Sequence, residues 1–358
     1  MKSVYIHIPF CRNICSYCDF CKFVYNEKWV GAYLTGLRNE IKDRYMDDSI
    51  RTIYIGGGTP SALSIEELRR LFKIISIFKT DELEEFTFEC NLSDITKELL
   101  VLLKYNKVNR LSIGIESFNK KNLEFLERTA DFKDAEEKIK LCREYGFNNI
   151  NIDLMYAIPG ETLSDLKKDL TLFLKLNPTH ISTYSLIIED HTKLANADTD
   201  YIREELDYEM FKTIEKRLSG ANHYEISNFA ISGYESKHNL VYWDNEEYYG
   251  FGLGAAGYID DIRYQNTKNL KEYLLGNYVA EKEILGKKEK MDYEIMLGLR
   301  KYAGIDINKF KEKYGEDIET IYNLKPLVKN KDLIKKKGHI FINPEKMYVM
   351  NEILIKII

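Results

Sequence analysis

Short β-rich runs alternate with amphipathic stretches over the first two thirds of the chain. The β-rich runs occupy 4–8, 51–55, 85–90, 110–115, 150–156 and 180–187. Apolar residues recur at helical spacing over 26–46, 65–78, 94–105, 133–145 and 163–176. Strands that alternate with helices pair in parallel through right-handed crossovers. Because a closed barrel of this type needs eight such units, the pattern predicts an α/β fold with a partial six-unit (β/α) barrel.

The pattern changes after about residue 225. A Tyr- and Gly-rich stretch comes first, and shorter helical segments follow near 268–275, 291–301 and 307–320. The runs HIFI and MYVM predict a closing strand pair and hence a smaller, winged-helix-like C-terminal domain of helices. We therefore expect three parts, which are a barrel over 1–225, a connecting region over 226–290 and the small domain over 291–358.

Composition and charge narrow the classes of function. The 358 residues carry a formal net charge of −5, which argues against a protein that binds nucleic acid by neutralising phosphates. A wing with Lys335 to Lys337 would suit DNA, but a solvated turn fits the acidic balance better. No apolar run is long enough to cross a bilayer, and the first residues do not resemble a signal peptide. We expect a cytoplasmic protein with at most peripheral membrane contact.

Four of the six cysteines fall within eleven residues, whereas Cys90 and Cys142 stand alone. Such clustering in a reducing compartment indicates metal ligation rather than disulfides. A zinc site would need a second pair of ligands, which is missing here. Three thiolates on a four-iron cluster would instead leave one iron open to a small chelating cofactor.

The choice among the clustered cysteines depends on spacing. The first triplet, Cys11-x3-Cys15-x2-Cys18, has the spacing of the radical S-adenosylmethionine (SAM) superfamily and follows the first predicted strand. The triplet that ends at Cys21 is also possible. We expect the first triplet to hold a [4Fe-4S] cluster, with Cys21 as a non-ligand or a latent fourth ligand.

Glycines and polar residues follow several later strands. The run GGGTPS at 56–61 comes directly after a predicted strand, and its glycines allow a ligand to approach the backbone closely. Glu89, Arg128 and Asp153 lie at or near later strand ends and would complete a polar pocket, because sites on such sheets form at the carboxyl edge. An internal salt bridge or a capped loop explains each of these three residues about equally well.

Seven segments, in order from residue 5 to about 305, carry a family resemblance: YIHIPFC-x3-C-x-YC, GGGTPS, SIGIESF, IDLMYAIPGET, YEISNFA, HNLVYW and MLGLR. Together they resemble the anaerobic coproporphyrinogen oxidase-like family of radical SAM proteins. The pair YEISNFA and HNLVYW, with the first cysteine at residue 11, is similar to the heme chaperone branch. Oxidases of this family place a fourth cysteine where this chain has Phe20.

The resemblance implies ligands for three cofactors. Cys11, Cys15 and Cys18 would bind the cluster, and His238 of HNLVYW would bind heme. The residues that would contact SAM are Tyr5, Gly57, Gly58, Thr59, Glu89, Glu116, Arg128 and Asp153. Glu116 stands where the family usually has Gln. An ionised Glu116 cannot donate a hydrogen bond and would sit near the SAM carboxylate, so either SAM affinity or the protonation state of Glu116 differs from the family pattern.

The resemblance also implies two functions. The first is a heme chaperone that delivers heme to acceptor proteins. The alternative is an oxygen-independent coproporphyrinogen III oxidase, which converts propionate side chains into vinyl groups through a radical derived from SAM, and another radical transformation of a tetrapyrrole is a weaker third. Whether the chain is an enzyme stays open. A flavodoxin or ferredoxin is the electron donor that the resemblance implies.

Overall fold

The computed structural model describes residues 1–358 except 198 and 200. Its main sheet confirms the predicted barrel. Six parallel strands form the centre of the sheet in the order in which they occur along the chain. They are β1 (Lys2–Ile8), β4 (Ile50–Gly57), β5 (Glu85–Asn91), β6 (Arg110–Glu116), β7 (Asn149–Tyr156) and β8 (His180–Ser185).

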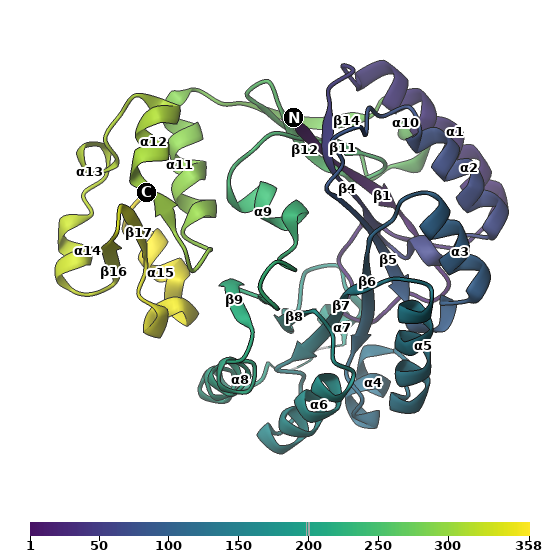
Figure 1. Cartoon of the computed structure of the whole chain (residues 1–358), viewed down its shortest axis with the longest axis horizontal. Coiled ribbons are helices and arrows are strands. Elements are labelled where there is room, and N and C mark those ends of the chain that lie inside the picture. The colour runs from purple at the N-terminus through teal and green to yellow at the C-terminus, as the bar shows by residue number, and fades with distance from the viewer. Residues whose placement is uncertain (198, 200) are drawn as a thin grey trace.

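Helices connect these strands and cover the outer, convex face of the curved sheet (Figure 1). They are α1 (Glu27–Arg44), α2 (Ile65–Ile75), α3 (Lys97–Tyr105), α4 (Lys120–Leu126), α5 (Phe132–Glu144) and α6 (Leu163–Lys175), and α7 (Lys193–Asn196) and α8 (Glu204–Arg217) follow β8. Helix α2 begins at a capping box between Ser64 and Glu67, in which each side chain accepts from the backbone N–H of the other residue.

Strand alternation divides the side chains of the sheet between two environments. Ile53 and Ile55 of β4 are fully buried in the core beneath the outer helices. Thr52 and Tyr54, at the alternate positions, face the concave side, because successive residues of a strand point to opposite faces. The same parity holds in the neighbouring strands, so polar and aromatic side chains line the inside of the barrel.

Further strands extend the sheet beyond the six units at both edges. On one edge, β11 (Tyr248–Phe251) pairs in parallel with β1, and antiparallel strands β12 (Ala256–Ile259), β13 (Ile262–Asn266) and β14 (Val279–Ile284) follow. On the other, β10 (Asn228–Ala230) and β9 (Asn222–Glu225) continue from β8 in antiparallel fashion. The residues expected to form a connecting region therefore include strands of the barrel sheet itself, together with α10 (Leu270–Leu274).

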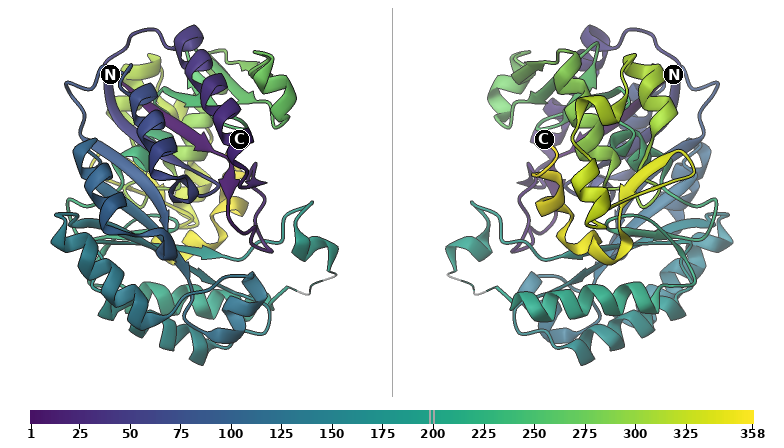
Figure 2. Two further views of the ribbon diagram at one scale, coloured as in Figure 1. Left: turned by 90° about the vertical axis from the view of Figure 1, so that its right-hand side faces the viewer. Right: turned by 90° about the vertical axis from the view of Figure 1, so that its left-hand side faces the viewer.

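A second apolar core lies in the C-terminal part, which faces the concave side of the barrel (Figures 1 and 2). Its elements are α11 (Lys287–Gly298), β15 (Ile305–Asp306), α12 (Ile307–Tyr314), α13 (Ile318–Ile321), α14 (Lys325–Lys329), β16 (Leu333–Lys336), β17 (His339–Ile342) and α15 (Met350–Leu354). A hairpin of β16 and β17 forms the wing. The predicted pairing of HIFI with MYVM was wrong, because Asn343 and Pro344 start a 3-10 helix that leads into α15.

None of the described helices has the length and apolar character that a membrane crossing requires.

Candidate functional site

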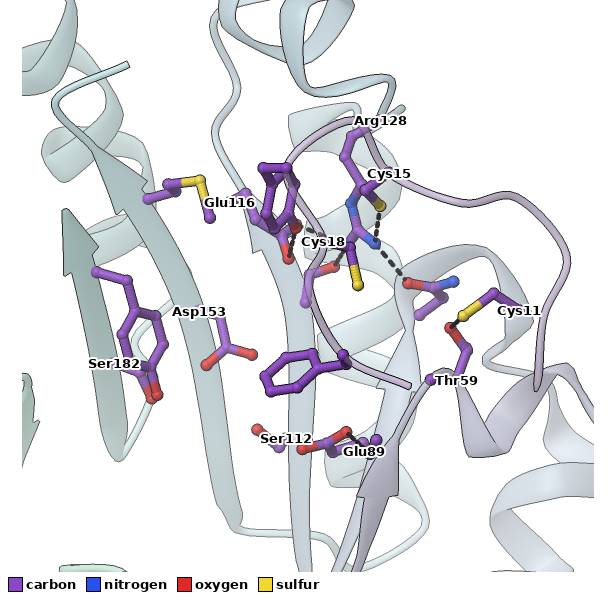
Figure 3. Close-up of a pocket in the computed structure, with 18 of the residues that line it drawn as sticks. Cys11, Cys15, Cys18, Thr59, Glu89, Ser112, Glu116, Arg128, Asp153 and Ser182 are labelled. Atoms are coloured by element: carbon purple, nitrogen blue, oxygen red, sulfur yellow. Dashed lines mark hydrogen bonds and ion pairs between the residues drawn. The ribbon is translucent and has the colours of Figure 1, made fainter. Parts of the chain in front are cut away.

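A cavity of about 500 Å³ opens at the carboxyl ends of the barrel strands and continues along the concave face (Figure 3). Its walls come from the loop after β1 and from the inward positions of β4 to β8. The volume lies in the range of small-molecule sites. The site residues predicted from the sequence that line this cavity are Cys11, Cys15, Cys18, Gly57, Gly58, Thr59, Glu89, Glu116, Arg128 and Asp153.

The loop with the clustered cysteines begins and ends in a short two-stranded sheet, β2 (Phe10–Cys11) with β3 (Phe23–Val24). Within it, Cys11 Sγ accepts a hydrogen bond from Thr59 Oγ1 at 3.5 Å and Cys15 Sγ accepts one from Arg128 Nη1 at 3.7 Å. Cys18 also faces the cavity. Among the described residues, no group of three or more His, Cys, Asp or Glu side chains lies close enough to hold a single metal ion.

Cys21 lies behind this loop rather than in the cavity wall. Its carbonyl accepts a 2.7 Å hydrogen bond from His7 Nε2, and a Cβ added at Gly254 would lie 2.6 Å from Cys21 Cβ. The structure therefore brings the first triplet to the cavity and holds Cys21 between β1 and the segment after β11.

The glycine segment packs edge to edge with the cysteine loop. Gly58 N donates to Ile8 O and Thr59 N donates to Phe10 O, each at 2.9 Å. A Cβ at Gly58 would come within 2.8 Å of Ile8 O, and Gly57 has a φ of +111°, which favours glycine. Glycine here allows the ends of β1 and β4 to approach closely, and this places the cysteine loop over the cavity.

Glu89 of β5 forms part of the cavity wall. Its carboxylate accepts from Tyr54 Oη at 2.6 Å and from Gly57 N at 3.0 Å. Burial raises the pKa of Glu89 to about 7, although both hydrogen bonds oppose this rise and the nearby Asp153 adds to it. Near neutral pH this side chain therefore exists in both protonation states.

Arg128 and Glu116 form an ion pair at the carboxyl end of β6, with Nη2 2.6 Å from Oε2. Arg128 also donates to Gly114 O at 2.7 Å and to Asn91 Oδ1 at 3.0 Å. Glu116 has a φ of +66°, a backbone conformation that is costly for a residue with a Cβ. The internal salt bridge that the sequence left open for Arg128 is thus formed, and its partner is Glu116.

The charges of this pair depend on burial and on each other. Burial raises the pKa of Glu116, and the Arg128 guanidinium opposes this rise. Burial alone would lower the pKa of Arg128, but Glu116, Tyr17 and Cys15 together raise it above its usual value. A carboxylate that entered the cavity would have to share Arg128 with Glu116.

Two other residues of the proposed SAM site lie on the same face. Asp153 accepts a 2.8 Å hydrogen bond from Asn151 Nδ2, and burial raises the pKa of Asp153. Tyr5 is on the concave face beside Tyr54 but outside the cavity lining, and its hydroxyl donates to His7 Nδ1 at 2.9 Å. Tyr5 therefore supports the wall rather than forming part of it.

The predicted heme ligand, His238, lies outside the cavity and is fully buried. It belongs to α9 (Lys237–Trp243), which packs against the concave face of the sheet (Figure 1). Its Nδ1 lies 2.8 Å from Thr52 Oγ1, and its Nε2 lies 2.8 Å from Tyr242 Oη. Burial lowers the pKa of His238 to about 3, so the imidazole is neutral and both nitrogens are engaged.

The first turn of α9 is held by Glu85 of β5. The Glu85 carboxylate accepts from Lys237 N at 2.9 Å and from His238 N at 3.1 Å. A carboxylate at this end also interacts favourably with the free N–H groups of the helix. The adjacent Asn239 lines the inner end of the cavity, so α9 and the cavity share one wall.

Sequence reasoning missed Tyr17, Tyr54 and Glu85. Tyr17 donates to Glu116 at 3.3 Å, Tyr54 to Glu89, and Glu85 holds α9. The alternation of apolar and polar residues in RTIYI and EFTFEC was the available signal, because it places Tyr54 and Glu85 on the face opposite to the apolar core.

Two family models match the chain. The model of the radical SAM superfamily matches residues 5–173, and that of the HemN C-terminal domain matches residues 285–348. The first covers the cysteine loop and five of the six central strands, and the second covers most of the winged C-terminal part.

Relatives named heme chaperone HemW match almost the whole chain. The chain is 40% identical to the heme chaperone HemW of Lactococcus lactis, with 93% of this chain and 92% of the relative covered. It is 38% identical to heme chaperone HemW of Bacillus subtilis, with coverage of 99% and 98%.

A solved structure supports the architecture. The coproporphyrinogen III oxidase HemN of Escherichia coli superimposes with a TM-score of 0.86 over 99% of this chain and 89% of that chain. At 22% identity this similarity establishes the fold alone.

Proposed function

The chain belongs to the HemW family of the radical SAM superfamily, and from this premise we propose that it is a heme chaperone. It would bind heme and deliver it to acceptor proteins, on a scaffold that holds a [4Fe-4S] cluster and SAM. The observation that carries the proposal is the similarity to heme chaperones over almost the whole chain, from the cysteine loop to the C-terminal part.

The cavity residues fit the cluster and SAM. Cys11, Cys15 and Cys18 would bind three irons, and the fourth would stay open to SAM. Once bound, the cluster and SAM supply one-electron chemistry. Because the N–H groups of Gly57, Gly58 and Thr59 already donate within the protein, these residues would hold SAM through their backbone carbonyl groups. Glu89, Glu116, Arg128 and Asp153 would hold it through their side chains, and Tyr5 through its support of the wall.

Each polar side chain would take a distinct part of SAM. Glu89 in its ionised state would accept from the ammonium group, and Asp153 would accept from ribose hydroxyls. Arg128 would bind the carboxylate with its planar fork. Because Glu116 already occupies Arg128 Nη2, we infer that this chain binds SAM more weakly than a chain without a carboxylate at this position.

Heme ligation by His238 would require a local opening. The ring has no exposure, and coordination needs a free nitrogen lone pair. Because the Thr52 hydroxyl donates to Ser3, it accepts from Nδ1–H of His238, and the Tyr242 hydroxyl then donates to Nε2. Release of the Tyr242 hydrogen bond would free Nε2, and displacement of α9 from Glu85 would expose it.

The proposed chaperone function also implies protein partners. We propose acceptor proteins that receive heme in the cytoplasm, and a flavodoxin or ferredoxin that reduces the cluster. The three-part division of the chain stays a proposal as well, with the middle part built onto the edges of the barrel sheet.

A second candidate is an oxygen-independent coproporphyrinogen III oxidase. The cavity in which the cysteine triplet and the SAM residues meet is the observation that favours it, because a chaperone needs no such cavity for heme transfer alone. The experiment therefore measures both activities.

The test uses protein with its cluster reconstituted under anaerobic conditions. Heme is titrated into wild type, His238→Ala and Tyr242→Phe, and coproporphyrinogen decarboxylation is assayed beside it. His238→Ala should lose the axial ligand and bind heme at least about tenfold more weakly. Tyr242→Phe removes one hydrogen bond, worth about 1 kcal/mol, from the closed state, so its apparent affinity should rise about fivefold.

Three results would argue against these assignments. Robust decarboxylation by wild type would replace the chaperone with the oxidase. Heme binding that is the same in wild type and His238→Ala would remove His238 as the ligand. Absence of heme binding in wild type would remove the chaperone function itself.

A further inference from the structure

Arg110 is the first residue of β6, and its side chain extends into the barrel. It is only 1% exposed, yet it lines the inner end of the cavity. It shares the concave face with Ser112 and Gly114, which follow it on the same strand. Gly114 contacts Arg128 at the cluster end. Four strand residues span about 13 Å, so Arg110 lies well below the proposed SAM carboxylate site.

The guanidinium of Arg110 has no partner among the described residues. No carboxylate of the described residues lies within 4.0 Å of it, whereas Arg44, Arg128 and Lys301 each form an ion pair within that limit. Its Nε is buried and makes no hydrogen bond. Buried charges are normally paired, and leaving one uncompensated costs several kcal/mol. An unpaired buried guanidinium that faces a cavity is therefore a binding feature rather than a packing feature.

The carboxylates that share the barrel interior are engaged elsewhere. Glu85 accepts from the first turn of α9, Glu89 from Tyr54 and Gly57, and Asp153 from Asn151. The two histidines nearby, His180 and His238, have their pKa values lowered by burial and by the charge of Arg110, so they are neutral. The inner end of the cavity thus carries the positive charge of Arg110 among neutral polar groups. The carboxyl groups of Glu89 and Asp153 are not within ion-pair distance of Arg110, although its charge opposes the rise in their pKa values.

The neutral polar groups near Arg110 could form hydrogen bonds with a polar ligand that binds there. Ser112, Asn151, Ser182 and Asn239 line the same inner end, and the labelled Ser112 and Ser182 point into it in Figure 3. Hydroxyl and amide groups both donate and accept hydrogen bonds. Asn151 already donates to Ser112 and Asp153, and Ser182 donates to Asn151. A carboxylate on Arg110 would therefore find the fork of the guanidinium, with the Ser112 hydroxyl and the Asn239 amide beside it.

We propose that Arg110 binds the carboxylate of a ligand at the inner end of the cavity, separate from the SAM carboxylate at Arg128. The guanidinium matches a carboxylate through two parallel N–H···O bonds. The chemical class is a carboxylate-bearing molecule, and the propionate of a tetrapyrrole and a free small carboxylate share this chemistry. The tetrapyrrole source rests on the proposed function, whereas the free carboxylate source does not.

The experiment compares a diacid with its ester. Metal-free mesoporphyrin IX and its dimethyl ester are titrated into the reconstituted protein with SAM present, and sodium propionate is titrated separately. The absence of iron removes any contribution from axial ligation. The variants are Arg110→Gln and Arg110→Lys, and Arg143→Gln on the outer helix α5 is the control with the same loss of charge. SAM affinity reports on whether the barrel is intact.

Wild type and Arg143→Gln should bind the diacid at least about tenfold more tightly than the ester. Arg110→Gln should bind both alike and should still bind SAM, and Arg110→Lys should fall between. Because the Arg110 charge lowers the pKa of Glu89, the SAM affinities of variant and wild type are compared at pH 8.5. If only propionate distinguishes wild type from Arg110→Gln, the ligand is a small carboxylate and the proposal stands in that form. If both Arg110 variants fail to fold, equal binding of diacid and ester by wild type, with no binding of propionate, still overturns it.

The proposal is overturned if wild type and folded Arg110→Gln show the same preference for the diacid over the ester and the same affinity for propionate. That result is distinguishable from failure of the chaperone function. If Arg110→Gln binds heme through His238 with the affinity of wild type, the chaperone function is left intact. Wild type that binds no heme would remove the chaperone function, while the propionate titration would still test Arg110.

Discussion

The ring of Tyr54 packs against the ring of His238, with 5.2 Å between their centroids. On its other side the Tyr54 hydroxyl donates to Glu89 in the cavity wall at 2.6 Å. A single side chain thus separates the proposed SAM site from the proposed heme ligand and contacts both. Because the two sites share a wall, a change at Tyr54 is expected to affect each of them in a different way.

Tyr54→Phe keeps the ring against His238 but removes the hydrogen bond to Glu89. Since that bond lowers the pKa of Glu89, its loss should raise this pKa above about 7. Less Glu89 is then ionised at pH 7, so SAM affinity should fall about threefold to tenfold at pH 7. Isothermal titration of SAM between pH 6.5 and 8.5 checks this, and the loss should shrink as the pH rises.

The matched control for this variant is Tyr242→Phe. It also removes one buried hydroxyl, but that hydroxyl bonds His238 rather than Glu89. Its SAM affinity should equal that of wild type at every pH. A loss in Tyr54→Phe that does not depend on pH would show that Glu89 titration is not the cause.

Glu116→Gln should strengthen SAM binding. The substitution removes the carboxylate that holds Arg128 Nη2 at 2.6 Å and keeps a side chain of the same shape. Without the competing negative charge, Nη2 can donate to the SAM carboxylate while it keeps its bond to Gly114 O, so affinity should rise about threefold to tenfold. Equilibrium dialysis with labelled SAM measures it, and weaker binding would mean that Glu116 itself contacts SAM favourably.

Gly58→Ala should disturb the cysteine loop. The new Cβ would lie 2.8 Å from Ile8 O and 2.9 Å from Phe10 N, both of which are backbone atoms that move only with the loop. We expect a loss of about 1–3 kcal/mol in unfolding free energy and incomplete cluster assembly, measured by denaturation and by iron content per chain. Gly220→Ala, whose Cβ would meet nothing within 4 Å, should match wild type in both.

Buried histidines should make the protein sensitive to acid. His223 stacks on Phe229 with 3.8 Å between centroids, and burial lowers its pKa from 6.5 to about 4. Because the unfolded chain takes up this proton first, the stability that His223 contributes is complete above pH 6.5 and is lost as the pH falls toward 4. At about 1.4 kcal/mol for each pH unit, the loss between pH 6.5 and 4.5 is about 2–3 kcal/mol.

His223→Phe keeps an aromatic ring at this position and removes the titration. Urea unfolding at pH 7.5 and 4.5 should show a smaller loss of stability in the variant than in wild type. Since His7, His180 and His238 have lowered pKa values in both proteins, the difference between the two slopes isolates His223. Equal slopes would show that this imidazole is protonated in the folded protein.

Most of the barrel could be predicted because local signals determine it. The alternation in runs such as RTIYI and EFTFEC, and the helical spacing over 65–78 with its cap at Ser64, depend on neighbouring residues only. The pairing of HIFI was mispredicted for the converse reason. HIFI pairs with residues 333–336 instead of MYVM, and packing in the C-terminal core rather than a local pattern selects this partner.

The sequence by itself determined the strands, the helices that cover them and the cysteine spacing that brings Cys11, Cys15 and Cys18 to one loop. These features follow from residue periodicity and from distances along the chain. Tertiary structure alone decided that Glu116 pairs with Arg128, that both nitrogens of His238 are engaged, and that Arg110 is buried with no ion-pair partner in the described part of the chain. Such relationships depend on side chains from different elements of the fold, so burial and charge compensation across the barrel control them rather than the order of residues.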